Sequence, residues 1–223
     1  MGILLIGNII NSVICTLEFR SEYSLDKNTS EELEELNRFI NSLDGVEVTF
    51  FDDINDVDIY IANRIASASS CVYDFNWQDF ISTNPYHRNK TKKEYAANKI
   101  DASIKSFCSK KANKPRIYKE IFTFSYSNNI AKMLNHITYG DNYCCSYYEN
   151  QNPETKFPKL QFVVIDDKEV IFVSSAYKPN LCSINNVRIA SIFCNYFEQA
   201  WELSIKLKDK NEINNNLIQD IQN

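Results

Sequence analysis

The chain reads KLQFVVIDDKEVIFVS from Lys159 to Ser174, and this stretch decides the predicted fold. Two runs rich in β-branched and aromatic residues, 160–166 and 169–174, are typical of strands. Because only a short acidic turn separates them, we expect them to pair as an antiparallel hairpin. Farther along, apolar residues recur at helical spacing over residues 186–208, which predicts one long amphipathic helix.

The residues before the hairpin predict an alternation of helices and strands. Apolar stripes predict helices over 30–43, 53–70, 90–111 and 128–137, and short aromatic or β-branched runs predict strands over 46–51, 71–77, 116–124 and 142–148. This order favours an α/β fold, in which helices flank a mixed, mostly parallel sheet. We divide the chain into an N-terminal segment with a linker (1–29), the α/β domain (30–208) and a polar tail (209–223) that is expected to fray.

Composition and cysteine usage narrow the class of protein. The chain has 223 residues, a formal net charge of −5 and 44% hydrophobic residues, which is enough for one domain with a substantial core. Its seven cysteines form no C-x-x-C pair, so we expect reduced, buried thiols and a cytoplasmic location. We predict no zinc site and no cofactor.

The N-terminal residues 2–19 are apolar and carry a single charge, on Glu18. The segment is barely long enough to span a bilayer, so an anchor at the inner face of the membrane and a buried element of the domain stay as equal alternatives. A cleaved signal peptide ranks last, because no basic region precedes the run and no small-x-small site follows it.

The order of the elements, the hairpin and a closing helix with Tyr196-Phe197-x-x-x-Trp201 resemble one half of the phospholipase D superfamily. In that family each half supplies H-x-K-x-x-x-x-D, with the Asp at the end of the first hairpin strand. Aligning that Asp with Asp166 puts Lys159 at the His position and Gln161 at the Lys position. Of the family's Gly-Ser-x-Asn on the second strand, at most a serine remains at Ser174.

This departure bears directly on catalysis. The resemblance implies attack on phosphorus by an imidazole, and a lysine ammonium at neutral pH has no lone pair with which to attack. The two histidines, His87 and His136, lie elsewhere in the sequence and are interpreted as surface or helix-end residues. We therefore predict a noncatalytic sensory, regulatory or interaction module, like the sugar-binding domains of archaeal transcription regulators that resemble this fold. One alternative is a phosphodiesterase or nuclease with an unrecognised site. A second alternative is a nucleic-acid-associated protein that uses the basic residues between 88 and 119.

A candidate ligand site lies at the end of the predicted strand 71–77, where open α/β sheets bind ligands. There Trp77 would stack on a small molecule and Asp74 would accept its hydroxyls or amines; the alternative is a core tryptophan beside a capping aspartate. We expect the same rim to gather Arg116, Lys159, Gln161 and Ser174. With Asp166, these residues complete the ligand-binding candidates.

Lysines and arginines concentrate between residues 88 and 119. Such a run suits a solvated helix face, an anionic membrane surface or nucleic acid, in that order of preference. A protein partner is also open, and the family's two-half architecture suggests a homodimer. Four aspartates at residues 52–58 are expected to cap a helix rather than bind a metal. The anionic-surface candidates are Lys90, Lys92, Lys93, Lys99, Lys110, Lys111 and Lys114.

Overall fold

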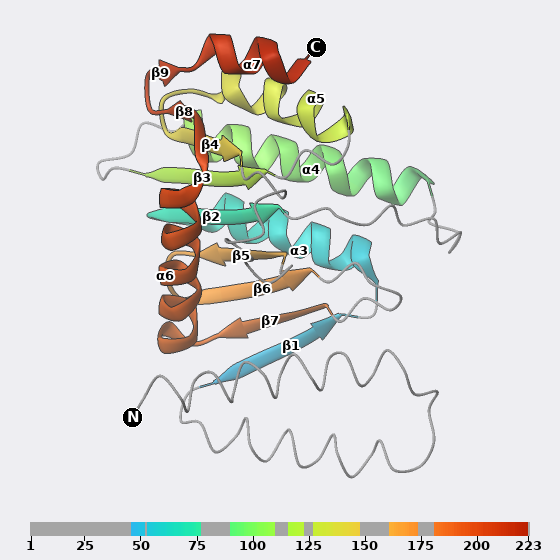
Figure 1. Ribbon diagram of the computed structural model, residues 1–223. Coiled ribbons are helices and arrows are strands. Elements are labelled where there is room, and N and C mark those ends of the chain that lie inside the picture. The colour runs from blue at the N-terminus through green and yellow to red at the C-terminus, as the bar shows by residue number, and fades with distance from the viewer. Residues whose placement is uncertain are drawn as a thin grey trace, which may run out of the picture. The chain divides into compact units, whose positions relative to one another are not determined.

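The computed structural model describes residues 46–51, 53–76, 90–109, 116–122, 127–147, 161–173 and 181–222 (Figure 1). The predicted helix over 30–43 and the apolar segment 2–19 lie outside these residues. The same is true of the candidate site residues Trp77, Lys159 and Ser174.

The described strands form one sheet with the order β1-β7-β6-β5-β2-β3-β4-β8-β9. Only β2, β3 and β4 run parallel to one another, and the other pairings are antiparallel. The α/β class with a mixed sheet is therefore confirmed. The expectation that the sheet is mostly parallel is wrong, because the parallel pairings are confined to the middle and the flanking strands pair antiparallel. The strands are β1 (Glu47–Phe51), β2 (Cys71–Asn76), β3 (Ile117–Phe122), β4 (Tyr143–Tyr147), β5 (Phe162–Ile165), β6 (Glu169–Val173), β7 (Leu181–Asn185), β8 (Ile205–Asp209) and β9 (Glu212–Ile213).

The predicted hairpin is present as β5 and β6, which pair antiparallel with Phe162 opposite Phe172. Asp166 and Asp167 in its turn have φ angles of 54° and 53°. Aspartate tolerates this left-handed conformation better than most residues, and it is what a tight hairpin turn requires.

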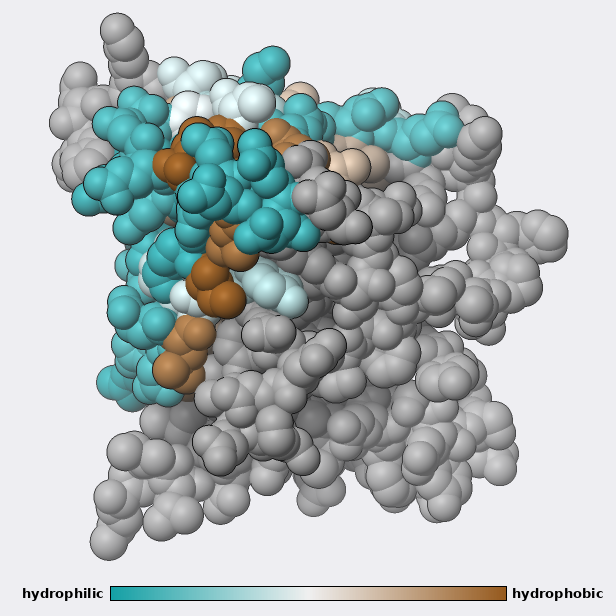
Figure 2. Space-filling model, turned by 45° about the horizontal axis from the view of Figure 1, so that its top comes forward, coloured by the Kyte–Doolittle hydropathy of each residue, from teal (hydrophilic) through white to brown (hydrophobic). Residues whose placement is uncertain are grey.

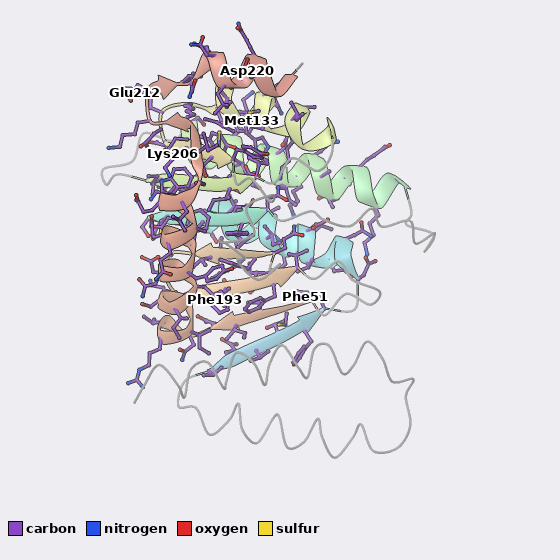
Figure 3. The ribbon with its side chains drawn as sticks, in the orientation of Figure 1. Phe51, Met133, Phe193, Lys206, Glu212 and Asp220 are labelled. Atoms are coloured by element: carbon purple, nitrogen blue, oxygen red, sulfur yellow. The ribbon has the colours of Figure 1, made fainter. Side chains whose placement is uncertain are left out.

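Helices cover both faces of the sheet, with α6 on one face and α3, α4 and α5 on the other (Figure 1). Figure 3 shows Met133 of α5 and Phe193 of α6 on these two sides. Phe193 packs edge-on against Phe162 and Phe172, while Met133 is fully buried in the opposite core. The helices are α3 (Ile54–Ser67), α4 (Lys90–Ser109), α5 (Ser127–His136) with the short 3-10 turn η1 (Ile137–Tyr139), α6 (Val187–Leu203) and α7 (Asn215–Gln222).

The structure differs from the prediction at the C-terminus. The helix predicted over 186–208 is too long, because α6 ends at Leu203 and the next residues form β8, which pairs with β4. Ser204 terminates the helix, since its hydroxyl bonds the Trp201 carbonyl and the Ser146 hydroxyl. The expectation of a fraying tail is also wrong, because β9 and α7 follow and Ile218 is buried.

The surface of the described part is mostly hydrophilic in the view of Figure 2, with hydrophobic residues exposed among the polar ones. Leu203, Ile205 and Ile213 are exposed hydrophobics from the end of α6 and the strands after it. Among the described residues, no helix is both long and apolar enough to cross a membrane. The described cysteines are free thiols, as predicted, and most are buried.

Candidate functional site

A buried layer of polar side chains lies between the middle of the sheet and helices α4 and α5. Tyr73 and Phe75 of β2 pack against Phe197 of α6, so the alternating residues Asp74 and Asn76 face the opposite side. The same alternation on β3 and β4 points further polar groups at this side. All of these side chains are buried: Asp74, Asn76, Tyr118, Glu120 and Tyr143.

Glu120 is the centre of this layer and accepts hydrogen bonds from four side chains. Its donors are Asn76 at 3.1 Å, Lys132 at 3.0 Å, Tyr143 at 2.8 Å and His136 Nδ1 at 2.9 Å. Burial alone would raise the pKa of Glu120, but the charges of Lys132 and His136 outweigh it and hold the pKa well below its usual range. Glu120 is therefore a stably ionised anchor for α5.

His136 is fully buried and uses both ring nitrogens. Nδ1 faces Glu120, and Nε2 lies 2.8 Å from Asp101 Oδ1 on α4. Burial would lower the pKa of His136, but the Glu120 carboxylate raises it above its ordinary value. A histidine held in this way has no free nitrogen with which to attack phosphorus. The interpretation as a surface residue is wrong, because the groups that bury His136 lie far from it in the sequence.

Asp74 is also buried, but it accepts fewer hydrogen bonds from the described residues than Glu120 does. One hydrogen bond reaches it, from the Tyr118 hydroxyl at 2.9 Å. Burial and the nearby charge of Glu120 raise the pKa of Asp74 to about 6. Beside it, the Asn76 carbonyl oxygen is buried and has no hydrogen-bond partner. The carboxyl end of β2 thus carries two acceptors that the described residues leave short of donors.

Gln161 lies at the same rim as Asn76. It precedes β5, whose first residue, Phe162, pairs with Phe75 near the end of β2. The Gln161 carbonyl accepts a hydrogen bond from Val173 at 3.0 Å, so the start of β5 and the end of β6 also meet here. Two of the described candidates, Asp74 and Gln161, therefore lie toward the same end of the sheet.

Arg116 lies at the opposite end of the parallel strands. It precedes Ile117, which pairs with Cys71 at the start of β2, so roughly 16 Å of strand separates it from the rim. Its guanidinium lies 5.5 Å from the centre of the Phe107 ring. The expectation that Arg116 and Gln161 share a rim is therefore wrong.

Asp166 is at this opposite end too, and its carboxylate is occupied by the backbone. It accepts from the amides of Ser69 at 2.8 Å, Ser70 at 2.7 Å and Cys71 at 3.2 Å. Burial would raise the pKa of Asp166, but these hydrogen bonds outweigh it and lower the pKa. The side chain ties the hairpin turn to the start of β2, and the structure does not bring it near Asp74.

Two lysines of the basic run, Lys92 and Lys99, lie beside other side chains of the protein. Lys92 pairs with Asp53 and Asp56, each at 3.0 Å, and Lys99 lies 6.0 Å from the centre of the Tyr95 ring. Asp53 caps α3 by accepting from the Asn55 amide at 2.7 Å, which confirms the predicted capping role. Lys110, Lys111 and Lys114 and the side chains of Lys90 and Lys93 lie outside the described residues.

No arrangement of histidine, cysteine and acidic side chains suited to a metal ion occurs within the described ranges.

No protein-family model matches the chain, and no curated protein matches it significantly. Solved structures similar to it include TrmBL2, an archaeal chromatin protein, with a TM-score of 0.48, 17% identity, and coverage of 90% of this chain and 67% of that one. Nuc from Salmonella typhimurium, a phospholipase D family member, has a TM-score of 0.48 and 13% identity over 74% of this chain and 99% of that one. NucT from Helicobacter pylori has a TM-score of 0.48 and 16% identity over 72% and 99%. At these identities the likeness concerns the fold alone.

Proposed function

We propose that this chain is a noncatalytic, phospholipase D-like module that binds a small ligand at the carboxyl end of β2 and acts in sensing, regulation or interaction. The observation that carries the proposal is the pair formed by Asp74 and Asn76. Among the described residues, the buried Asp74 carboxylate has one hydrogen-bond donor and the neighbouring Asn76 carbonyl oxygen has none.

Keeping Asp74 in this place costs stability at neutral pH. Its pKa of about 6 in the folded protein, against 3.8 ordinarily, means that ionisation opposes folding. Groups held at such a cost gather at functional sites, because binding rather than stability accounts for their position. The cost is therefore an argument for a ligand.

The noncatalytic part of the proposal rests on the hairpin and on His136. At the position where the family has its lysine, this chain has Gln161, and Asp166 is occupied by backbone amides. Each ring nitrogen of the buried His136 lies against a carboxylate of the protein, so neither nitrogen is placed to act on a substrate as a nucleophile or a general base.

The ligand should present hydrogen-bond donors, since the Asp74 carboxylate and the Asn76 side-chain carbonyl are both acceptors. Hydroxyl-rich sugars and small amines meet this requirement, and Trp77, which follows Asn76 directly, supplies an aromatic ring to stack on. Lys159 and Ser174 remain proposed members of the site.

The binding proposal is tested by thermal shift with maltose, glucose, ethanolamine and spermidine. A compound at one hundred times its dissociation constant stabilises the folded state by about 2.7 kcal/mol, which is readily measured. Asp74→Asn should abolish the shift. Asp220→Asn, a matched change on the exposed face of α7, should preserve it. An equal shift in both variants would contradict a site at Asp74.

The noncatalytic proposal is tested separately with bis(p-nitrophenyl) phosphate in the presence of EDTA. We expect no turnover above the buffer rate. Turnover that disappears in both His87→Gln and His136→Gln would overturn this part of the proposal.

A further inference from the structure

One histidine at the end of helix α5 contacts both α4 and β3. On α4, Asp101 Oδ2 accepts from Asn135 at 3.0 Å and from the Tyr139 hydroxyl at 3.0 Å, while Oδ1 faces His136 Nε2 at 2.8 Å. On β3, Glu120 faces His136 Nδ1 at 2.9 Å. We call this set of contacts the α5 clamp.

The clamp as observed requires a particular protonation state. Both ring nitrogens of His136 lie at hydrogen-bond distance from carboxylate oxygens, and ionised carboxylates only accept. The imidazolium donates to both at once. A neutral imidazole carries one N–H, so one of the two carboxylates would then face a lone pair.

We propose that His136 is a proton-dependent clamp. Loss of its proton breaks the contact with Asp101 Oδ1 and loosens α5 and η1, which then keep the hydrogen bonds of Asn135 and Tyr139 to Asp101, while the contact of His136 with Glu120 remains. This inference is independent of the proposed ligand site, because it involves no bound molecule.

The two carboxylates differ in a way that decides which contact is lost. The Glu120 side chain is fully buried, whereas the Asp101 side chain is 41% exposed. Water can solvate Asp101 when its contact with His136 is lost, but no solvent reaches Glu120. The remaining proton therefore stays on Nδ1, where a buried anion would otherwise lose a donor.

The charged groups around His136 set the pH range. Glu120 and Asp101 favour its protonated form, and Lys132 on the same helix opposes it. The net effect raises the pKa of His136 above 6.5, so the clamp is fully closed below that pH and opens as the pH rises through the raised value. The titratable and charged groups that face the imidazole from the surrounding elements are Asp74 (β2), Glu120 (β3), Tyr143 (β4), Asp101 (α4), Lys132 (α5), Tyr139 (η1) and, across the Tyr143 ring, Lys208 (β8).

The test is an NMR titration of the full chain between pH 5 and 10. His136 should titrate above pH 6.5, and the signals of the Asn135 side-chain amide and the Tyr139 ring should change with the same midpoint. Asp101→Asn keeps the side-chain shape, removes one carboxylate, and should lower the midpoint by about one pH unit. His87→Gln, which removes the second histidine of the chain, should leave the midpoint unchanged.

Three results would overturn the clamp. One is a His136 midpoint at or below 6.5, another is a midpoint that Asp101→Asn leaves in place, and the third is an Asn135 or Tyr139 response that does not follow His136. His136→Gln should make the α5 signals independent of pH. If that variant does not fold, the Asp101→Asn titration decides the question alone.

Discussion

The two ends of strand β2 hold an aspartate in opposite ways. At its amino end, Asp166 accepts hydrogen bonds from three backbone amides and from the hydroxyls of Ser69 and Ser70. Near its carboxyl end, Asp74 has one tyrosine donor and a neighbouring anion. The pKa of the first is lowered and that of the second is raised. The same side chain thus stabilises the fold at one end of the strand and destabilises it at the other.

The largest effect on the free energy of unfolding should come from a change at Glu120. This carboxylate is buried like Asp74, but it accepts several hydrogen bonds like Asp166. Glu120→Gln leaves the charges of Lys132 and His136 without their partner, and should cost about 3–5 kcal/mol in the free energy of unfolding. Urea denaturation at pH 6 measures this. Glu198→Gln, which removes the partly exposed partner of Lys119, is the matched control and should cost less than about 1 kcal/mol. Equal losses would mean that the buried network adds nothing.

Replacement of the stabilising aspartate should have the next largest effect. Asp166→Asn keeps a residue that tolerates the positive φ but loses the charge that strengthens the amide hydrogen bonds, and should cost about 2 kcal/mol at pH 7. Because the pKa is lowered, the loss should shrink as the pH falls through the folded pKa, below 3.8. Asp167→Asn, at the neighbouring turn position, serves as the control with a smaller loss. A pH-independent loss would argue against a role for the ionised carboxylate.

Replacement of the destabilising aspartate should have the opposite sign. Asp74→Asn keeps an acceptor for Tyr118 and removes the buried charge, so it should stabilise the protein by about 1–2 kcal/mol at pH 8. The gain in the free energy of unfolding should appear as the pH rises from 3.8 toward 6. It should be absent below 3.8, because the wild-type carboxyl is then neutral in both the folded and the unfolded protein. Denaturation midpoints at pH 3.5 and 8 give the comparison. Destabilisation at pH 8 would contradict the assignment of Asp74 as a costly group.

The smallest effect concerns a single donor to Asp166. Ser70→Ala removes the hydroxyl that lies 2.9 Å from Oδ1 but keeps the backbone amide, and should cost about 0.5–1 kcal/mol. Ser109→Ala, at an exposed hydroxyl on α4, should change the unfolding free energy by less than that. A loss as large as that of Asp166→Asn would mean that the hydroxyl, rather than the amides, supports the turn.

Local patterns were sufficient for most of the fold. The hairpin β5–β6, strands β2 and β3, and helices α3 to α5 were predicted because turn residues and apolar periodicity are properties of neighbouring residues. Strand β8 was missed because these patterns involve neighbouring residues alone. Ile205 and Leu207 alternate like a strand, but they directly follow the apolar stripe of α6 and were read as part of it.

The buried layer could not be read from local patterns. His136 meets Asp101 and Glu120 only because α4, α5 and β3 fold together, and its neighbours in the sequence resemble an ordinary helix end. One signal was present: Asp74 and Glu120 stand in strands made mostly of apolar and aromatic residues, where an inward-facing carboxylate needs partners. The sequence therefore indicated that partners exist, but not which ones.

Helix α6 has a consequence for the order of assembly during synthesis. It connects β7, near one edge of the sheet, to β8, which pairs with β4 on the side away from β3 (Figure 1). Until the residues of β8 have left the ribosome, the edge of β4 that pairs with β8 stays unpaired, and the carbonyls of Ile137 and Gly140 lack the Lys208 ammonium that donates to them in the folded protein. A nascent chain stalled after α6 therefore presents the open edge of β4 to the strands of other polypeptides.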